Sequence, residues 1–311
     1  MYYKHVIKKV TKGLVMLSNM KIAIFGGDGR HIEIIKKLSE LDARVYLIGY
    51  EQLEQFVPGV IKEKLENLHL AEMDAIILPV SGTGENGEIE SIFSNETIKL
   101  TEDILCQLKE SCIIFTGISN SYLDSLVSQT KCVFIRLFER DDVAIYNSIP
   151  TAEGTLKMAI ENTDITIHDS DVAVLGLGRV GMTVARTFAA IGANVKVGAR
   201  KKKDLARIKE MGLKPFHLKN LADEVKEIDL CINTIPHKIL HAGMIANMSI
   251  HTTIIDLASK PGGTDFRFAE KRGIRAILAP GLPGIVAPKT AGQILANCLT
   301  DLLTEVHEGE L

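Results

Sequence analysis

DVAVLGLGRVGMTVARTFAAIGANVKVGAR, residues 171–200, decides the fold of this chain because it predicts one complete strand, turn, helix and strand unit. The run VAVL is typical of a buried strand. Gly176, Gly178 and Gly181 follow with G-x-G-x-x-G spacing. The first glycine of such a motif permits a tight turn, the second lets backbone amides approach a pyrophosphate, and the third lets the helix pack on the strand. With a second strand at 194–197, the stretch predicts dinucleotide binding rather than a turn that serves only packing.

The residues after the second strand indicate which dinucleotide binds. NAD sites usually carry Asp or Glu about 20 residues beyond the first glycine, where the carboxylate accepts hydrogen bonds from the ribose. This chain has Arg200, Lys201, Lys202 and Lys203 there. A guanidinium can hold a 2′-phosphate with paired hydrogen bonds, whereas a carboxylate would repel it. We therefore predict NADP(H), held by Arg200, although the lysines taken singly are typical of a solvated patch.

Length and composition set the class of protein. The chain has 311 residues, 46% of them apolar, and a net charge of −3, which predicts two globular domains with ample core. Its basic residues form no long stripe, which argues against nucleic-acid binding. No apolar run approaches the roughly 18 residues of a membrane span, and residues 1–19 lack the features of a signal peptide. Five widely spaced cysteines without a C-x-x-C pair favour a reduced, cytoplasmic protein.

Apolar runs alternate with helical stretches along the chain, which is the pattern of parallel sheets covered on both faces. We predict an α/β protein of two doubly wound Rossmann-like domains with parallel sheets and a cleft between them. The segment 148–150 should break the chain before a connecting helix at 152–161. The predicted parts are an N-terminal extension at 1–19 that contributes little to the fold, a substrate and catalytic domain at 20–150, an NADP-binding domain at 151–288, and a C-terminal helix at 289–311 that crosses back to the first domain.

The first domain opens with a turn that resembles a nucleotide site only in part. The segment GGDGRH, residues 26–31, does not fit the glycine motif and places Asp28 where a phosphate would approach, so a second dinucleotide is not expected. The helix start and Arg30 could instead bind a carboxylate. Asp28 could equally be a helix cap and Arg30 a solvated charge. The loops 81–87 and 117–120 are further candidates for ligand binding, or plain loops.

Several longer segments carry a family resemblance. LFERDDVAIYNSIPTAEG and LAPGLPGIVAPKTAGQILAN, together with GGDGRHIEIIKKL and DLASKPGGTDF, resemble the A subunit of dipicolinate synthase from spore-forming bacteria. The resemblance covers the chain from about residue 20 to its end. It implies oxidation of a dihydrodipicolinate to dipicolinate together with a B subunit, in the mother cell during sporulation. We also expect a homo-oligomer.

This chemistry moves a hydride to the nicotinamide and a proton to a base, so the protein mainly has to place the reactants. For the base, His31, Asp28, Glu139 and Asp141 are candidates, and an imidazole suits neutral pH best. The carboxylates of the substrate need positive groups, for which the candidates are Arg30, Lys289, Arg136 and Arg140, each of which could be a surface charge. The predicted catalytic set is His31, Arg30, Asp28 and Lys289.

The predicted cofactor contacts lie on the glycine turn and on the ends of the strands that follow it. No histidine or cysteine spacing indicates a metal site. Two other functions remain open: another two-domain NADP-dependent dehydrogenase of the hydroxy-acid or shikimate type, and a regulator that senses NADPH without catalysis. The predicted contacts are Gly176, Gly178, Arg179, Val180, Gly181, Arg200, Lys201, Thr234, Pro236, Ser259, Leu282 and Pro283.

Overall fold

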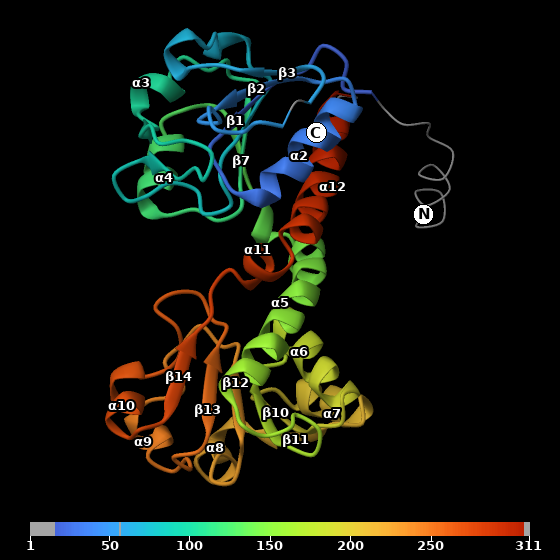
Figure 1. The fold of residues 1–311 in the computed structure, drawn as a ribbon, viewed down its shortest axis with the longest axis vertical. Coiled ribbons are helices and arrows are strands. Elements are labelled where there is room, and N and C mark those ends of the chain that lie inside the picture. The colour runs from blue at the N-terminus through green and yellow to red at the C-terminus, as the bar shows by residue number, and fades with distance from the viewer. Residues whose placement is uncertain (1–15, 56, 308–311) are drawn as a thin grey trace. The chain divides into compact units, whose positions relative to one another are not determined.

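The computed structural model describes residues 16–55 and 57–307 and consists of two compact units (Figure 1). The first unit comprises the chain up to Val143 together with the segment from Pro288 onward. The second unit is Ala144–Ala287. Each unit has its own sheet and its own core, so each is described by itself.

A parallel sheet of six strands forms the centre of the first unit, in the order β3-β2-β1-β4-β7-β8. The strands form from the apolar runs of the sequence, and the central ones are almost wholly buried. Their bounds are β1 Lys21–Phe25, β2 Arg44–Ile48, β3 Val60–Lys62, β4 Ala75–Ile77, β7 Ile113–Thr116 and β8 Val133–Arg136. The helices are α2 Gly29–Glu40, α3 Glu102–Leu105, α4 Ser121–Val127 and α12 Pro288–His307, with short 3₁₀ turns η1 Leu65–Asn67, η2 Leu70–Glu72 and η3 Leu137–Glu139.

Helix α12 packs along α2 in the first unit. A Cβ added at Gly292 would lie 2.4 Å from the carbonyl oxygen of Arg30, so the two helices touch through backbone at this glycine. Leu295, Leu299 and Leu303 of α12 are buried in the same cluster as the inner face of α2. Burying three leucines contributes about 5 kcal/mol or more to the unit.

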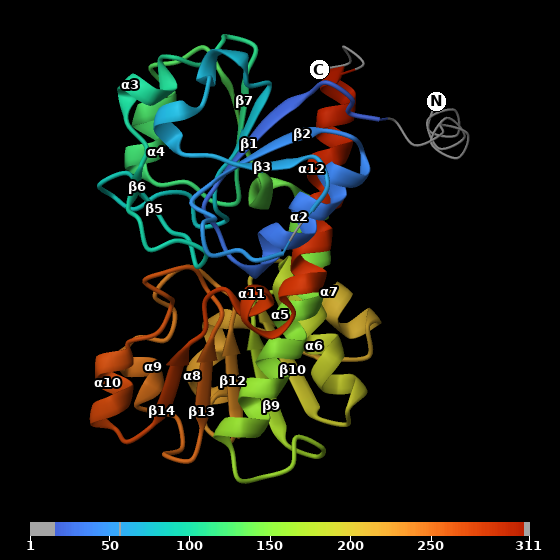
Figure 2. The same ribbon diagram turned by 45° about the horizontal axis from the view of Figure 1, so that its top comes forward.

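The second unit repeats the plan, with a parallel sheet of six strands in the order β11-β10-β9-β12-β13-β14. Side chains of β9 alternate between two cores: Val172 and Val174 lie in one, Ala173 and Leu175 in the other. Figure 2 shows helices on both faces of this sheet. The strands are β9 Asp171–Leu175, β10 Asn194–Ala199, β11 Lys214–His217, β12 Leu230–Asn233, β13 Thr253–Asp256 and β14 Arg275–Leu278. The helices are α5 Asp141–Asn162, α6 Arg179–Ala190, α7 Lys202–Glu210, α8 Leu221–Glu224, α9 Ala242–Ile245, α10 Phe266–Lys271 and α11 Leu282–Val286, with η4 Leu218–Asn220.

The predicted class of two doubly wound, parallel α/β units is confirmed. Some elements differ from the prediction. The strand β3 and the hairpin of β5 Glu88–Ile89 and β6 Ile98–Lys99 were not predicted, because both are short and partly exposed.

The prediction of a chain break at residues 148–150 is wrong, because Pro150 lies inside the continuous helix α5. A proline removes one amide donor from a helix. Hydroxyl groups bond the neighbouring carbonyls of the same turn: Ser148 Oγ donates to Ile145 O at 2.6 Å, and Thr151 Oγ1 donates to Asn147 O at 2.8 Å. The carbonyl that loses its amide donor at Pro150 is Tyr146 O, four residues back, so these two hydrogen bonds lie beside the gap and do not replace the missing one.

The N-terminal extension predicted at 1–19 lies outside the described residues as far as residue 15. Its last part does take part in the fold. Leu17 is fully buried in the core of the first unit, and its amide donates to Leu41 O at 2.7 Å. For these residues the expectation of little contribution is wrong, since Leu17 fills space beneath the end of α2.

Candidate functional site

The carboxyl edge of the second sheet carries a turn that requires glycine. Gly176 follows β9 with a φ of +100°, and a Cβ added there would lie 2.6 Å from Thr234 Oγ1. A Cβ added at Gly181 would lie 2.2 Å from Gly176 O, so α6 packs directly on the turn. At Gly178 no non-neighbouring atom lies within 4 Å of the added Cβ. Two glycines thus close the turn from below, and the third leaves room for a phosphate to approach the backbone.

Helix α6 begins at this opening. Its N-cap is Gly178, which offers no side chain to accept hydrogen bonds from the amides of the first turn. These amides have no partner within a helix, and the helix dipole makes its N-terminus positive. Arg179 is exposed and Val180 is half-buried at the same place. An anion such as a pyrophosphate fits this helix end.

Arg200 lies on the same edge of the sheet as the glycine turn. In the parallel ladder Leu175 pairs with Gly198, and Gly176 N donates to Gly198 O at 2.9 Å. Arg200 follows two residues later and is exposed, as is Lys201. No acidic side chain follows β10 before α7 begins. Arg200, the group predicted to bind the 2′-phosphate, therefore lies beside the glycine turn predicted to bind the pyrophosphate.

Three further predicted contacts lie on loops after β12 and β13. Thr234 is half-buried, and its Oγ1 donates to Leu175 O at 2.8 Å, which ties the loop after β12 to the glycine turn. Pro236 and Ser259 are exposed. All three belong to the carboxyl edge of the sheet, where open α/β sheets bind ligands.

Leu282 and Pro283 do not fit a role as cofactor contacts through their side chains. Both are buried at the start of α11, and Leu282 is only 4% exposed. A Cβ added at Gly154 of α5 would lie 3.0 Å from Leu282 Cβ. The Leu282 side chain anchors α11 on α5, which the apolar sequence PGLPGIV did not distinguish from a ligand-binding loop.

A buried polar pair on the same edge was not predicted from the sequence. Asn233 ends β12, Asp256 ends β13, and both are 0% exposed. Asn233 Nδ2 donates to Asp256 Oδ1 at 3.0 Å. The signal available in the sequence was a polar residue at the end of each of two adjacent apolar strands.

The matching turn of the first unit is filled by the chain itself. Gly26 and Gly27 have φ of +52° and +118°. Gly27 N donates to Glu90 O at 2.8 Å, and Ile92 N donates to Gly27 O at 3.0 Å. A Cβ added at Gly26 would lie 2.5 Å from Glu90 O. The segment between β5 and β6 thus occupies the place over β1 where a dinucleotide would pass.

Asp28 is the N-cap of α2 and pairs with Arg30. The Asp28 carboxylate accepts from Arg30 N at 3.0 Å and from the Arg30 guanidinium at 2.5–3.0 Å. Burial raises the pKa of Asp28, but the side chain of His31 and the hydrogen bonds and charge of Arg30 outweigh it and hold the pKa well below its ordinary value. A carboxylate this acidic is a poor proton acceptor, which argues against Asp28 as the base.

His31 does not fit the predicted role of an accessible base. His31 is only 1% exposed, and its Nδ1 accepts a hydrogen bond from Asp28 N at 3.1 Å as part of a capping box. With Nδ1 as acceptor, the neutral ring carries its proton on Nε2. Nε2 is buried and has no hydrogen-bond partner. The imidazole is therefore placed to donate rather than to accept a proton.

Lys289 lies on the exposed first turn of α12, next to the start of α2. A Cβ added at Gly29 would lie 3.5 Å from Pro288 Cβ, so the two helices begin side by side. Burial raises the pKa of Glu33 on α2, but Lys36, Gln293 and, more weakly, Lys289 lower it below its ordinary value. Arg30 and Lys289 thus belong to one surface of the first unit.

The loops 81–87 and 117–120 pack on each other at the same edge of the first sheet. Asn120 Nδ2 donates to Thr83 O at 2.6 Å, and Asn120 Oδ1 caps α4 by accepting from Leu123 N at 2.9 Å. A Cβ added at Gly82 would lie 2.8 Å from Ile118 O. Packing therefore explains these polar and glycine residues.

Arg136, Arg140 and Glu139 are engaged in surface ion pairs. Arg136 pairs with Asp124 at 2.7 Å, and Arg140 pairs with Asp142 at 2.9 Å. Glu139 lies 3.8 Å from Arg136. These ion pairs support the alternative in which the charges of the segment ERDD, residues 139–142, pair with neighbouring charges instead of binding a substrate.

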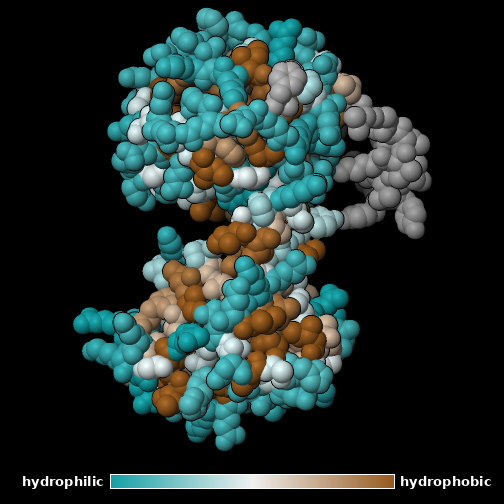
Figure 3. Space-filling view, viewed as in Figure 1, coloured by the Kyte–Doolittle hydropathy of each residue, from teal (hydrophilic) through white to brown (hydrophobic). Residues whose placement is uncertain are grey.

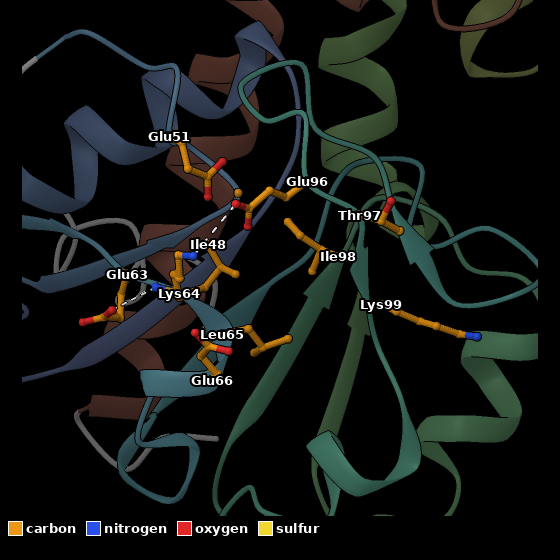
Figure 4. Close-up of a pocket in the computed structure, with 11 residues that line it drawn as sticks. Ile48, Glu51, Glu63, Lys64, Leu65, Glu66, Glu96, Thr97, Ile98 and Lys99 are labelled. Carbon is orange, nitrogen blue, oxygen red and sulfur yellow. Dashed lines mark hydrogen bonds and ion pairs between the residues drawn. The ribbon is translucent and has the colours of Figure 1, made fainter.

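A pocket of about 350 Å³ lies beside the carboxyl end of β2 in the first unit (Figure 4). Lys64 reaches toward Glu96 in it, with 4.0 Å between their charged atoms. The pocket was not predicted, and its charges are of both signs. Its charged lining consists of Glu51, Glu63, Lys64, Glu66, Glu96 and Lys99.

Residues 16–55 and 57–307 contain no group of three or more His, Cys, Asp or Glu side chains that could hold a metal ion. Within the same ranges, no helix combines the length and apolarity needed to cross a bilayer. All five cysteines are free thiols.

Two family models match the chain, and the second extends through α12, which the fold places in the first unit. Residues 21–138 match the family described as the N-terminal domain of the dipicolinate synthase A subunit, and residues 150–311 match the family described as alanine dehydrogenase/PNT, C-terminal domain. The dipicolinate synthase A subunit of Bacillus subtilis is 57% identical over 95% of this chain and 99% of its own length.

Solved structures give the same result. The crystal structure of the dipicolinate synthase A subunit from Bacillus halodurans is 57% identical, covers 93% of this chain and 99% of its own, and superposes with a TM-score of 0.91. The corresponding structure from Bacillus subtilis is 56% identical, covers 96% of this chain and 100% of its own, and has a TM-score of 0.92.

Proposed function

This chain belongs to the family of dipicolinate synthase A subunits, and on that premise we propose that it oxidises dihydrodipicolinate to dipicolinate with NADP as hydride acceptor. The reaction removes a hydride and a proton from the dihydropyridine ring. The nicotinamide, when bound, supplies the acceptor for the hydride. The chain's own residues bind and orient the cofactor and the substrate.

The observation that carries this proposal is the turn at Gly176–Gly181. The open space at Gly178 and the uncapped start of α6 fit a pyrophosphate. The choice of NADP rests on Arg200, which stands beside this turn where an NAD site would have an acid. Thr234, Pro236 and Ser259 are proposed to line the path of the nicotinamide half.

For the dicarboxylate substrate we propose Arg30 and Lys289 at the adjoining starts of α2 and α12. Both are cationic, and the start of α12 adds the positive end of its dipole, whereas the start of α2 is already capped by Asp28. The charge of Arg30 is shared with Asp28, so Lys289 is the stronger of the two as a carboxylate ligand. His31 contributes a buried donor rather than the base.

The protein's partners follow from the family. Relatives named as the A component of a synthase imply that a second component exists, and we propose that a B subunit is the partner during sporulation, in the cytoplasm of the mother cell. We also propose a homo-oligomer. Ile145 and Ile149 of α5 and Ile285 of α11 are 53%, 50% and 70% exposed, and Figure 3 shows apolar surface over both helices. Such surface suits contact with another protein.

The test compares cofactor binding by Arg200→Ala with that by Lys203→Ala. Calorimetry should give a Kd for NADPH about 10- to 100-fold weaker in Arg200→Ala, because a charge-assisted bond to the 2′-phosphate is lost, with the Kd for NADH nearly unchanged. Lys203→Ala removes one charge of the same basic run and serves as control. Equal losses for NADPH and NADH in Arg200→Ala would remove the NADP assignment.

A turnover assay distinguishes the proposed reaction from the two alternatives, another NADP-dependent dehydrogenase and a regulator that senses NADPH. Dihydrodipicolinate made freshly by its synthase should be converted while the absorbance of NADPH appears, with or without the B subunit. Binding of NADPH without turnover in both cases would favour a regulator. Turnover only with hydroxy acids would favour the other dehydrogenase class.

A further inference from the structure

A buried carboxylate joins the loops at the carboxyl edge of the second sheet. Asp256 is 0% exposed, and its Oδ1 accepts from Asn233 Nδ2 and from Ala258 N, both at 3.0 Å. Its Oδ2 accepts from Gly263 N at 2.8 Å and from Thr264 Oγ1 at 2.6 Å. All four partners are donors and none is a cation. The loop at 257–264 is thus folded around one negative charge.

Asn233 extends this network to the loop after β12. Its Oδ1 accepts from Ile235 N at 3.1 Å, and its Nδ2 donates to Ile235 O at 3.1 Å. A Cβ added at Gly263 would lie 2.4 Å from Asn233 Nδ2 and 2.6 Å from both Ile235 O and His237 O. The two loops therefore meet in direct backbone contact, with the Asp256 carboxylate behind them.

The network is continuous with the glycine turn. Asn233 pairs with Leu175 in the sheet, and the next residue, Thr234, donates to Leu175 O. Gly176 lies against Thr234 Oγ1. The strands β9 and β12 are adjacent at the point where the strand order reverses, and ligands of open α/β sheets bind there.

A contribution to stability alone does not explain why a carboxylate is buried at position 256. Removing a carboxylate from water is costly, and apolar packing of similar volume often stabilises a protein as well. A carboxylate with four donors does fix its neighbours in direction and distance, because each hydrogen bond has narrow geometry. This favours a role in holding the loops in one shape.

We propose that Asp256 is a positioning residue that fixes the loops at 234–237 and 257–264 for the nicotinamide half of the cofactor, without contacting the phosphates. This proposal rests on the proposed function, because it takes the dinucleotide as ligand. It separates two tasks: the glycine turn and Arg200 hold the adenosine and phosphate half, whereas the Asp256 network shapes the surface for the ring that reacts.

Two ligands test this separation on the full chain. NADPH reaches both halves of the site, whereas 2′-phospho-ADP-ribose lacks the nicotinamide and reaches only the phosphate half. The variants are Asp256→Asn, which keeps the shape and loses the charge, and Thr264→Val, which removes one donor. The control is Thr252→Val, because Thr252 is 1% exposed, precedes the amino end of β13, and donates to Ile228 O at 2.8 Å.

Asp256→Asn should weaken NADPH binding about tenfold or more, and Thr264→Val about threefold, as expected for loss of charge-assisted hydrogen bonds. Binding of 2′-phospho-ADP-ribose should stay within about twofold of the unmodified protein, and Thr252→Val should change neither Kd by more than that. A merely structural role would weaken both ligands together.

Parallel losses for the two ligands, or no loss of NADPH binding in either variant, would overturn the proposal. If Asp256→Asn does not fold, Thr264→Val decides the matter alone, since it keeps the carboxylate and three of its donors. If the unmodified protein binds neither ligand, the proposed function itself fails and this proposal falls with it. If the unmodified protein binds both ligands but the variants do not show the predicted selective loss of NADPH binding, only the role of Asp256 is refuted and the proposed function stands.

Discussion

Gly178→Ala and Gly181→Ala should separate cofactor binding from folding, although the two glycines belong to one motif. A methyl group at Gly178 meets no non-neighbouring atom within 4 Å. A methyl group at Gly181 would lie 2.2 Å from Gly176 O, far inside the van der Waals distance. The first change therefore alters only the space open to a ligand, and the second displaces α6 from the turn.

The expected magnitudes follow from these distances. Gly178 has φ −82° and ψ −169°, which alanine can adopt. Loss of a good N-cap costs about 0.5–1 kcal/mol, and the smaller entropy of the unfolded alanine chain returns about 0.4–1 kcal/mol, so stability should hardly change. Overpacking at Gly181 should cost about 1–3 kcal/mol. For a unit of this size that lowers Tm by roughly 3–10 °C.

Binding of NADPH should be weaker in both variants, in Gly181→Ala because α6 is displaced from the glycine turn. In Gly178→Ala the methyl group keeps phosphate oxygens away from the amides at the start of α6. Loss of one such hydrogen bond, worth about 1.5–3 kcal/mol, weakens Kd roughly 10- to 150-fold.

Calorimetry gives the Kd for NADPH of each variant, and thermal unfolding gives the Tm of each variant. If Gly178→Ala binds NADPH as tightly as the unmodified protein, or unfolds as early as Gly181→Ala, Gly178 does not have the role in phosphate binding proposed for it.

Two other predictions concern titratable groups. Burial raises the pKa of the Cys231 thiol to about 12. Iodoacetamide at pH 8 should therefore label the exposed Cys106 and spare Cys231 in the native protein, as measured by peptide mass spectrometry. Early labelling of Cys231 would contradict its burial. Because the pKa of Asp28 is lowered by folding, its contribution to stability is present above the ordinary value of 3.8 and is lost as the pH falls below it. Asp28→Asn should therefore lower the free energy of unfolding by about 1 kcal/mol at pH 7 and by less at pH 3. A difference independent of pH would show that the charge of Asp28, beside His31 and Arg30, contributes nothing to stability.

The fold was predictable from the sequence where burial is complete. Strands such as β1 and β9 are apolar on both faces, and that pattern is typical of a parallel sheet with helices on both sides. The strand β3 and the hairpin β5–β6 are two or three residues long and partly exposed, so no periodicity could reveal them. Pro150 misled the prediction because a proline disfavours a helix interior without excluding it.

The candidate site was predictable where one continuous segment makes it. The glycine turn and Arg200 lie within 25 residues of sequence, counted from 176 to 200, and their spacing alone carries the geometry. The pair of Asn233 and Asp256 is 23 residues apart, and only the parallel pairing of β12 and β13 brings it together. His31 lies at a helix start, a place that is usually exposed, whereas here its ring packs against Gly27 and is buried.

The two sheets share one strand order, so topology cannot decide which unit binds a dinucleotide. The difference lies in the residue that starts the helix after the first strand. Gly178 leaves the first amides of α6 without a side-chain acceptor, whereas the Asp28 carboxylate satisfies an amide of α2 and adds a negative charge. Both effects of Asp28 oppose a phosphate, and the backbone of Glu90 fills the space as well. Asp28→Gly alone should therefore not create a second dinucleotide site that binds NADPH, because the segment after β5 would still occupy it.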